Sequence, residues 1–344
     1  MDKETLSNYG WIVILVLILA VLLALATPFG NFIADGFKAA YMGFFQTGEN
    51  ALGIVIPGSD NEEIDTNTQT FVPGLYQTGT ITKYQSGEDV SALLITPWDE
   101  LVSNGVIHVD NRAVYTVCDL DTGTNSSSNA LSGDLIMPED GSVTALGNFD
   151  MNNYVGNMAF TQCTELTGIS IPDSITVISD AAFMYCEKLN TVKFIGNPQV
   201  KKIGMYAFGL TPIQGIEIPN SVTDIGMAAF SGCSNLSSVT IPESISVINP
   251  YVFHSCTKLT NVNLPSSLTE IEREAFNSCS ELTNITLPSE LSTIGEYVFA
   301  NCTKLSNITY RGSTNKWNTA NIAHNWNTNI PAAAVHCSDG DVTL

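Results

Sequence analysis

The chain has 344 residues, which is enough for one large domain or two ordinary ones. It carries 34 Asp and Glu residues against 13 Lys and Arg residues, and the resulting net charge of −21 repels phosphate backbones, which argues against a nucleic-acid partner. Hydrophobic residues make up 44% of the chain, ample for a core, and part of them is concentrated near the N-terminus.

After a short tail at residues 1–9, an unbroken apolar run extends from Gly10 to Ala26. Its length is at the lower end of what spans a bilayer as a helix. Beyond Pro28, aromatic and aliphatic residues recur at steps of three or four. This pattern predicts a kinked helix over residues 10–45, apolar in its first part and amphipathic in its second.

Three interpretations of this helix remain open. We favour a retained membrane anchor at residues 10–27 that leaves the C-terminal part outside the cell. A secretory signal peptide cleaved after Ala26 is the second interpretation. The third is a pilin-like subunit that self-assembles through the N-terminal helix. Gly10 resembles the processing glycine of type IV prepilins, but the fifth position after it is Leu15, where such pilins carry Glu.

Residues 46–70 are polar and acidic, which predicts a linker. Residues 71–130 contain short β-rich runs and one expected helical turn at 97–102, so we expect a small α+β cap on the segment that begins at residue 131. The segment 119–125 alternates oxygen-bearing side chains as calcium loops do, but it lacks the downstream Glu of such loops. We therefore expect a surface loop and no metal site there.

Phenylalanine then recurs with a period close to 23 residues, which indicates stacked repeats. The repeated residues are Phe160, Phe183, Phe208, Phe230, Phe253, Phe276 and Phe299. In one copy, Val239 and Ile241 alternate with polar residues, which predicts a short strand that Pro242 ends. A second inward pair follows at Ile245 and Ile248, and we expect the step to the phenylalanine to form a turn of helix.

Cysteine follows the phenylalanine by three residues in six copies. Equivalent side chains of stacked coils are about 4.8 Å apart, wider than a disulfide prefers, so we expect a buried ladder of thiols. The ladder cysteines are Cys163, Cys186, Cys233, Cys256, Cys279 and Cys302. Cys118 and Cys337 lie outside this ladder, and the sequence leaves open whether they pair.

The repeat pattern L-x-x-I-x-I-P-x-x-V-x-x-I-x-x-x-A-F-x-x-C resembles the BspA-like leucine-rich repeat over residues 131–310. The copy at 191–216 lacks the proline and the cysteine, and we expect an altered coil there. Residues 311–344 resemble the terminal cap of the family, and Trp317 and Trp326 are expected to cover the last coil. The resemblance implies a surface or secreted protein of a host-associated organism, with adhesion as the role of several members.

The predicted fold class is a mainly β, or α+β, repeat solenoid with a long N-terminal hydrophobic helix. The sequence holds no catalytic signature, and His108, His254, His324 and His336 lie in separate segments without metal-ligand spacing. We therefore expect no enzyme, no cofactor and no metal. His254 follows Phe253 at a variable position and is expected to face solvent.

The outward positions of the repeat strands carry small polar side chains that could hydrogen-bond a ligand, although solubility alone would also explain them. The candidate binding strip comprises Ser170, Lys193, Glu217, Ser238, Thr240, Asn261, Asn263, Asn284, Thr286, Asn307 and Thr309. We expect adhesion, or binding of a host or neighbouring-cell protein or glycan, through this strip. The alternative is a filament subunit that displays the solenoid.

Overall fold

A computed structural model describes residues 54–55, 73–82, 89–116, 118–119, 124–125, 130–153 and 155–344. The chain divides into two compact units, one comprising residues 1–72 and 76–96, the other 73–75 and 97–344. The predicted helix over 10–45 and nearly all of the predicted linker over 46–70 lie outside the described residues, so their interpretations stay predictions. Within the described part, no helix has the length and apolarity needed to cross a bilayer.

In the first unit, the described elements are all strands. They are β1 (Ile54–Val55), β2 (Gly74–Thr82, whose first two residues belong to the second unit) and β3 (Asp89–Pro97). In the sheet, β3 lies between β1 and β2, and it pairs antiparallel with β1 so that Ile54 is opposite Leu94. The β-rich runs predicted between residues 75 and 95 thus form two long strands.

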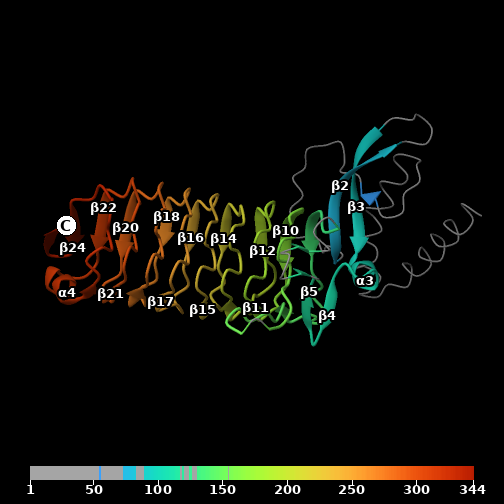
Figure 1. Cartoon of the computed structure of the whole chain (residues 1–344), viewed down its shortest axis with the longest axis horizontal. Coiled ribbons are helices and arrows are strands. Elements are labelled where there is room, and N and C mark those ends of the chain that lie inside the picture. Colours follow the sequence, from blue (N-terminus) through green and yellow to red (C-terminus); the bar gives the residue numbers. More distant parts are fainter. Residues whose placement is uncertain are drawn as a thin grey trace, which may run out of the picture. The chain divides into compact units, whose positions relative to one another are not determined.

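The second unit is a β-solenoid in which each coil contributes one strand to each of two sides (Figure 1). The strands of the first side are β8 (Gly133–Ile136), β10 (Leu166–Ile171), β12 (Thr191–Phe194), β14 (Gly215–Glu217), β16 (Ser238–Thr240), β18 (Asn261–Asn263), β20 (Asn284–Leu287), β22 (Asn307–Tyr310) and β24 (Ala334–Cys337). Those of the second side are β9 (Ala145–Leu146), β11 (Val177–Ile178), β13 (Lys202–Ile203), β15 (Asp224–Ile225), β17 (Val247–Ile248), β19 (Glu270–Ile271), β21 (Thr293–Ile294) and β23 (Asn321–Ile322).

Neighbouring coils are joined by parallel strand pairing, with a register shift between Leu166 and Gly168 where β10 pairs with β8. Val239 is opposite Val262 on the first side, and Ile248 is opposite Ile271 on the second. Each of these side chains points into the core, where its exposed fraction is 8% or less. Because one coil cannot cover its own apolar residues, stacking is what buries them, at about 1.5–3 kcal/mol for each fully buried aliphatic side chain.

The repeat phenylalanines form one continuous stack through the core. Their side chains are fully buried, successive ring centroids are 5.1–5.5 Å apart, and the rings are tilted by 2–18° to one another. At the C-terminal end, Trp326 meets Phe299 edge-on at 5.9 Å, and Trp317 meets Trp326 at 5.7 Å. The expected covering of the last coil by two tryptophans is therefore confirmed.

The turn of helix expected at each phenylalanine is wrong. From Phe183 to Phe299, the backbone has positive φ two residues before and two residues after the phenylalanine, as at Tyr251 (61°) and Ser255 (59°) around Phe253. The N–H of Phe253 donates to the carbonyl oxygen of Ala275 on the next coil at 2.8 Å, and the N–H of the following residue, His254, closes a four-residue turn with the carbonyl oxygen of Tyr251. The backbone thus bonds between coils, which an α-helix could not do.

Thiols link successive coils, a role that the sequence pattern alone did not reveal. The Sγ of Cys256 donates to the carbonyl oxygen of Phe230 at 3.3 Å, and Cys186, Cys233, Cys279 and Cys302 make the same bond at 3.0–3.2 Å. In the copy that lacks cysteine, Thr211 takes the position and its hydroxyl is 3.4 Å from the Sγ of Cys233. The coil at 191–216 is altered but present, as expected.

Small caps close the described solenoid. On the N-terminal side, helix α3 (Trp98–Ser103) and the hairpin of β4 (His108–Asp110) and β5 (Ala113–Tyr115) contribute buried side chains, and β5 pairs with β9. Strands β6 (Cys118–Asp119) and β7 (Thr124–Asn125) pair with each other. On the C-terminal side lie helix α4 (Thr314–Thr319), whose N-terminus is capped by Ser313, and strand β25 (Gly340–Thr343), which pairs antiparallel with β24.

Candidate functional site

The strip predicted from the sequence lies on the outer face of the first-side strands. Pairing brings its members into rows: Ser170 is opposite Lys193, Glu217 opposite Thr240, Ser238 opposite Asn261, Thr240 opposite Asn263, Asn284 opposite Asn307, and Thr286 opposite Thr309. Nine of the eleven side chains are exposed, and those of Ser170 and Thr309 are partly exposed. We call these eleven residues the strand-face strip.

Most hydrogen-bonding groups of the strand-face strip have no partner among the residues that the structure describes. Asn263 donates to the hydroxyl of Thr240 at 3.1 Å, and Asn284 donates to the adjacent Thr283 at 3.1 Å. The other strip side chains make no hydrogen bond or ion pair to any described residue; they are Ser170, Lys193, Glu217, Ser238, Asn261, Thr286, Asn307 and Thr309. Their donors and acceptors are therefore available to an external molecule.

Hydroxyl side chains elsewhere on the coils behave differently. Thr176, Thr223, Thr269 and Ser292 precede the second-side strands, and each donates to a backbone carbonyl of the preceding coil at 3.0–3.3 Å. Such groups stabilise the stack and cannot at the same time donate to a ligand. The sequence shows Ser and Thr at both kinds of position, and only the structure separates the available ones from those already bonded.

Charge is distributed unevenly along the strip. Lys193 and Glu217 lie in its N-terminal part, whereas the eight members from Ser238 to Thr309 are uncharged. In a protein with a net charge of −21, this segment is a neutral surface of hydroxyl and amide groups. The arrangement suits hydrogen bonding to an uncharged ligand better than ion pairing.

His336 extends the strip beyond the residues predicted from the sequence. It is opposite Thr309, and its Nδ1 is 2.9 Å from Oδ1 of Asp341 on β25. The 23-residue period fails between these coils because helix α4 is inserted, and the step from Thr309 to His336 is 27 residues. The strand pattern around Val335 was the signal that could have revealed it.

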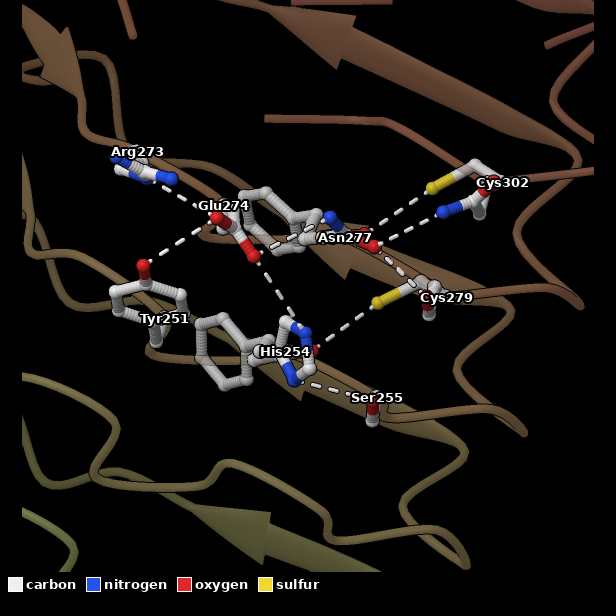
Figure 2. A network of polar contacts seen from close by, with 12 residues as sticks. Tyr251, His254, Ser255, Arg273, Glu274, Asn277, Cys279 and Cys302 are labelled. Carbon is white, nitrogen blue, oxygen red and sulfur yellow. Dashed lines mark hydrogen bonds and ion pairs between the residues drawn. The ribbon is translucent and has the colours of Figure 1, made fainter. Parts of the chain in front are cut away.

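A second polar cluster lies on the turns around the phenylalanines, where the sequence predicted none (Figure 2). Glu274 is at its centre, with Oε1 accepting from Nε of Arg273 at 3.0 Å and from the hydroxyl of Tyr251 at 3.3 Å. Nε2 of His254 is 3.7 Å from Oε2 of the same carboxylate, and Nδ1 is 3.0 Å from the Ser255 hydroxyl. The exposed fraction of the Glu274 side chain is only 17%.

This turn-face network continues within the coil of Glu274 and onto the next coil. Asn277 donates to Oε2 of Glu274 at 3.4 Å and accepts from Ser278 at 2.7 Å, and Asn301 reaches Asn277 at 3.5 Å. His254 is half-buried, with Nδ1 within hydrogen-bond distance of Ser255 and Nε2 close to the Glu274 carboxylate, so it faces solvent only in part. The network joins residues 20 to 24 positions apart, which is why a local motif search did not find it.

Several cysteine thiols have pKa values that burial shifts upward. Burial raises the pKa of the Cys233 thiol to about 12, and it raises those of Cys186, Cys256 and Cys279 well above the ordinary value. Cys337 is a free, half-buried thiol whose pKa is raised by burial and by nearby carboxylates. The side chain of Cys118 lies outside the described residues. No group of three or more potential metal ligands occurs in the described part of the chain.

The repeat region matches one known protein family. The family described as BspA type leucine-rich repeat region matches residues 153–256 and 201–327, with six copies. No curated protein matches the chain.

Several solved structures are similar. A leucine-rich cell surface protein of Faecalibacterium prausnitzii is 27% identical with a TM-score of 0.42, and the match covers 59% of this chain and 54% of that one. A leucine-rich repeat protein of Bacteroides ovatus is 22% identical with a TM-score of 0.45, and the match covers 79% of this chain and 72% of that one. The leucine-rich repeat protein of T. pallidum is 21% identical with a TM-score of 0.38, and the match covers 56% of this chain and 96% of that one. The matched region spans about half of the length of the Faecalibacterium protein.

Proposed function

Since the chain belongs to the family of BspA-type leucine-rich repeat proteins, we propose that it is a cell-surface adhesin that binds a host or neighbouring-cell protein or glycan through the strand-face strip. One observation carries the proposal. Most strip side chains have no partner in the described part of the chain, whereas the hydroxyl groups of the rows beside the second-side strands are bonded to the preceding coil.

The strip suits a large, weakly charged partner. Its rows are one strand spacing apart, about 4.8 Å, and they repeat over successive coils, so many weak hydrogen bonds can form at once. Each neutral hydrogen bond contributes only about 0.5–1.5 kcal/mol, so affinity has to come from their number. An extended partner that contacts several coils meets this requirement.

The binding proposal is tested with the full chain on an array of purified matrix proteins and glycans. The variant replaces Asn261, Asn284 and Asn307 by Ala, which leaves the inward residues unchanged. A matched control replaces three exposed residues on the second side, Lys202, Asp224 and Asn321, by Ala. Loss of a bound partner in the first variant but not in the control is the expected result. Equal binding by both variants, or no bound partner for the unaltered chain, would contradict the proposal.

We propose further that residues 10–27 anchor the chain in the membrane with the solenoid outside the cell. The support is the apolar run from Gly10 to Ala26. The N-terminal residue of the mature chain tests this proposal. Met1 is expected for a retained anchor, whereas Trp11 would point to a pilin-like filament subunit and Thr27 to a secreted form.

A further inference from the structure

Tyrosine occupies the position two residues before the phenylalanine in every second coil. The residues at this position are Ala181, Tyr206, Ala228, Tyr251, Glu274 and Tyr297, in chain order. All six have positive φ, from 52° to 61°. We call Tyr206, Tyr251 and Tyr297 the tyrosine row. Its members are partly exposed and lie on the turns, away from the strand-face strip.

Packing does not explain the tyrosine row. Ala181 and Ala228 occupy the same position in intervening coils, and the phenylalanine stack continues unchanged past them. A left-handed backbone is unfavourable for bulky L-residues, and Gly or Asn would tolerate it better. An aromatic ring on alternate coils is therefore more consistent with a ligand outside the protein than with the core.

Two rings of the row contact neighbouring residues on the turns, and the stacking of the coils sets the spacing of the row. Tyr251 contacts His254 edge-on with ring centroids 5.8 Å apart, and the Tyr206 ring lies against Gly209, where an added Cβ would be 3.3 Å from it. Because phenylalanines of successive coils are 5.1–5.5 Å apart, members of the row are separated by about 10 Å. This is close to the spacing of alternate rings in an extended 1,4-linked polysaccharide, which present the same face to one side.

The groups of the turn-face network are hydrogen-bonded to one another, which fixes their positions beside the Tyr251 ring. The turn-face network offers a carboxylate, an imidazole and amides in one place, at Glu274, His254 and Asn277 (Figure 2). Aromatic faces pack against the C–H groups of a pyranose ring, and a few fixed polar groups then set its orientation. In the coil between Tyr206 and Tyr251, Ala228 and Gly232 occupy the positions of Glu274 and Ser278. The polar groups beside the tyrosine row are therefore concentrated between Tyr251 and Tyr297.

Charge limits the class of polysaccharide. The net charge is −21, and the carboxylates of Glu274 and Glu296 are the acidic groups of this part of the turn face, with Arg273 as their cation. Sulfated and uronic polymers would be repelled. We propose that the tyrosine row and the turn-face network bind an uncharged, extended β-1,4-linked polysaccharide that runs along the solenoid, at a site separate from the strand-face strip.

The test is calorimetric titration of the full chain with cellohexaose. Isomaltohexaose, which has the same number of rings in α-1,6 linkage, is the control ligand. Binding of cellohexaose alone is expected. Tyr251→Ala and Tyr297→Ala should each weaken it by up to about tenfold, the loss expected for one aromatic contact. Tyr251→Phe keeps the ring and should retain most of the affinity.

Three controls make the result specific. Tyr185→Ala removes an exposed tyrosine on the turns that is not part of the row and should leave cellohexaose affinity unchanged. Asn261→Ala, on the strand-face strip, should also leave it unchanged. Thermal melting should show Tyr251→Ala folded, because Ala228 occupies the equivalent position. Equal affinity of the tyrosine variants and the unaltered chain, or no binding of cellohexaose at millimolar concentration, would overturn the inference, while binding through the strip would stand or fall separately.

Discussion

The thiol of Cys256 donates a hydrogen bond to the carbonyl oxygen of Phe230, 3.3 Å away on the preceding coil. The same bond recurs along the ladder, so the cysteine contributes both a small buried side chain and a link between coils. Free cysteine is usually a hydrophobe with a weak donor, and here that donor has a defined acceptor. Cysteine at this position is therefore a structural residue.

Cys256→Ala should destabilise the protein, because the carbonyl of Phe230 loses its thiol donor and a small cavity remains. The expected loss is about 1–3 kcal/mol in the free energy of unfolding. Cys256→Thr should cost less, because it leaves a smaller cavity and because Thr211 already fills this position in another coil, where its hydroxyl donates to the carbonyl oxygen of Phe208 in its own coil. Urea denaturation of both variants measures the difference. An alanine variant as stable as the unaltered chain would contradict the role of the thiol, and a threonine variant less stable than the alanine variant would contradict the equivalence with Thr211.

Phe253→Ala should cost about 3–5 kcal/mol, because it removes a fully buried ring from the middle of the stack. Both stacked contacts, to Phe230 and Phe276, are lost at once. Phe253→Leu should cost less because it leaves a smaller cavity. Thermal or denaturant unfolding is the measurement, and an alanine variant as stable as the unaltered chain would mean that the ring is not in the core.

Ser278→Val should destabilise the protein by about 1–3 kcal/mol, because φ at this position is +62° and β-branched residues strongly disfavour it. Ser278→Gly should be neutral or stabilising, since Gly232 occupies the equivalent position. Thr286→Val, on an extended strand, is the matched control and should have little effect on stability. Equal stability of the valine variants at positions 278 and 286 would contradict the left-handed backbone conformation at Ser278.

Glu272 and Glu243 should have opposite effects on pH-dependent stability. Burial, together with Glu270, raises the pKa of Glu272, so the ionised form is disfavoured in the folded state. Stability from this group falls as pH rises from the unfolded pKa through the folded one. Glu272→Gln should therefore raise the melting temperature at neutral pH and have no effect in acid. A melting-temperature difference that is independent of pH would contradict this assignment.

Hydrogen bonds from the hydroxyl and the backbone N–H of Ser266 lower the pKa of Glu243. This group stabilises the fold above its unfolded pKa, and the contribution is lost as pH falls through the folded pKa. Glu243→Ala should therefore lower the melting temperature at neutral pH, with a difference that shrinks in acid. The melting temperatures of the Glu243 and Glu272 variants, each measured at several pH values from acidic to neutral, provide the comparison.

Much of the solenoid could be predicted because its signal is periodic. The recurrence of phenylalanine and of pairs such as Val239 and Ile241 survives in a single sequence, and a fixed period requires equivalent residues to stack. The outward placement of Asn261 and its neighbours follows from the alternation of strand side chains. The covering of the last coil by tryptophan was also expected, because an uncovered coil would expose apolar residues.

Only the tertiary structure decided which polar side chains are available and which are bonded between coils. Thr176 and Ser238 are alike in the sequence, but only the first donates to the preceding coil. The network around Glu274 and the left-handed turns were not predictable either. Hydrogen bonds between residues one coil apart depend on how the coils stack, and the sign of φ is not encoded in hydrophobic periodicity.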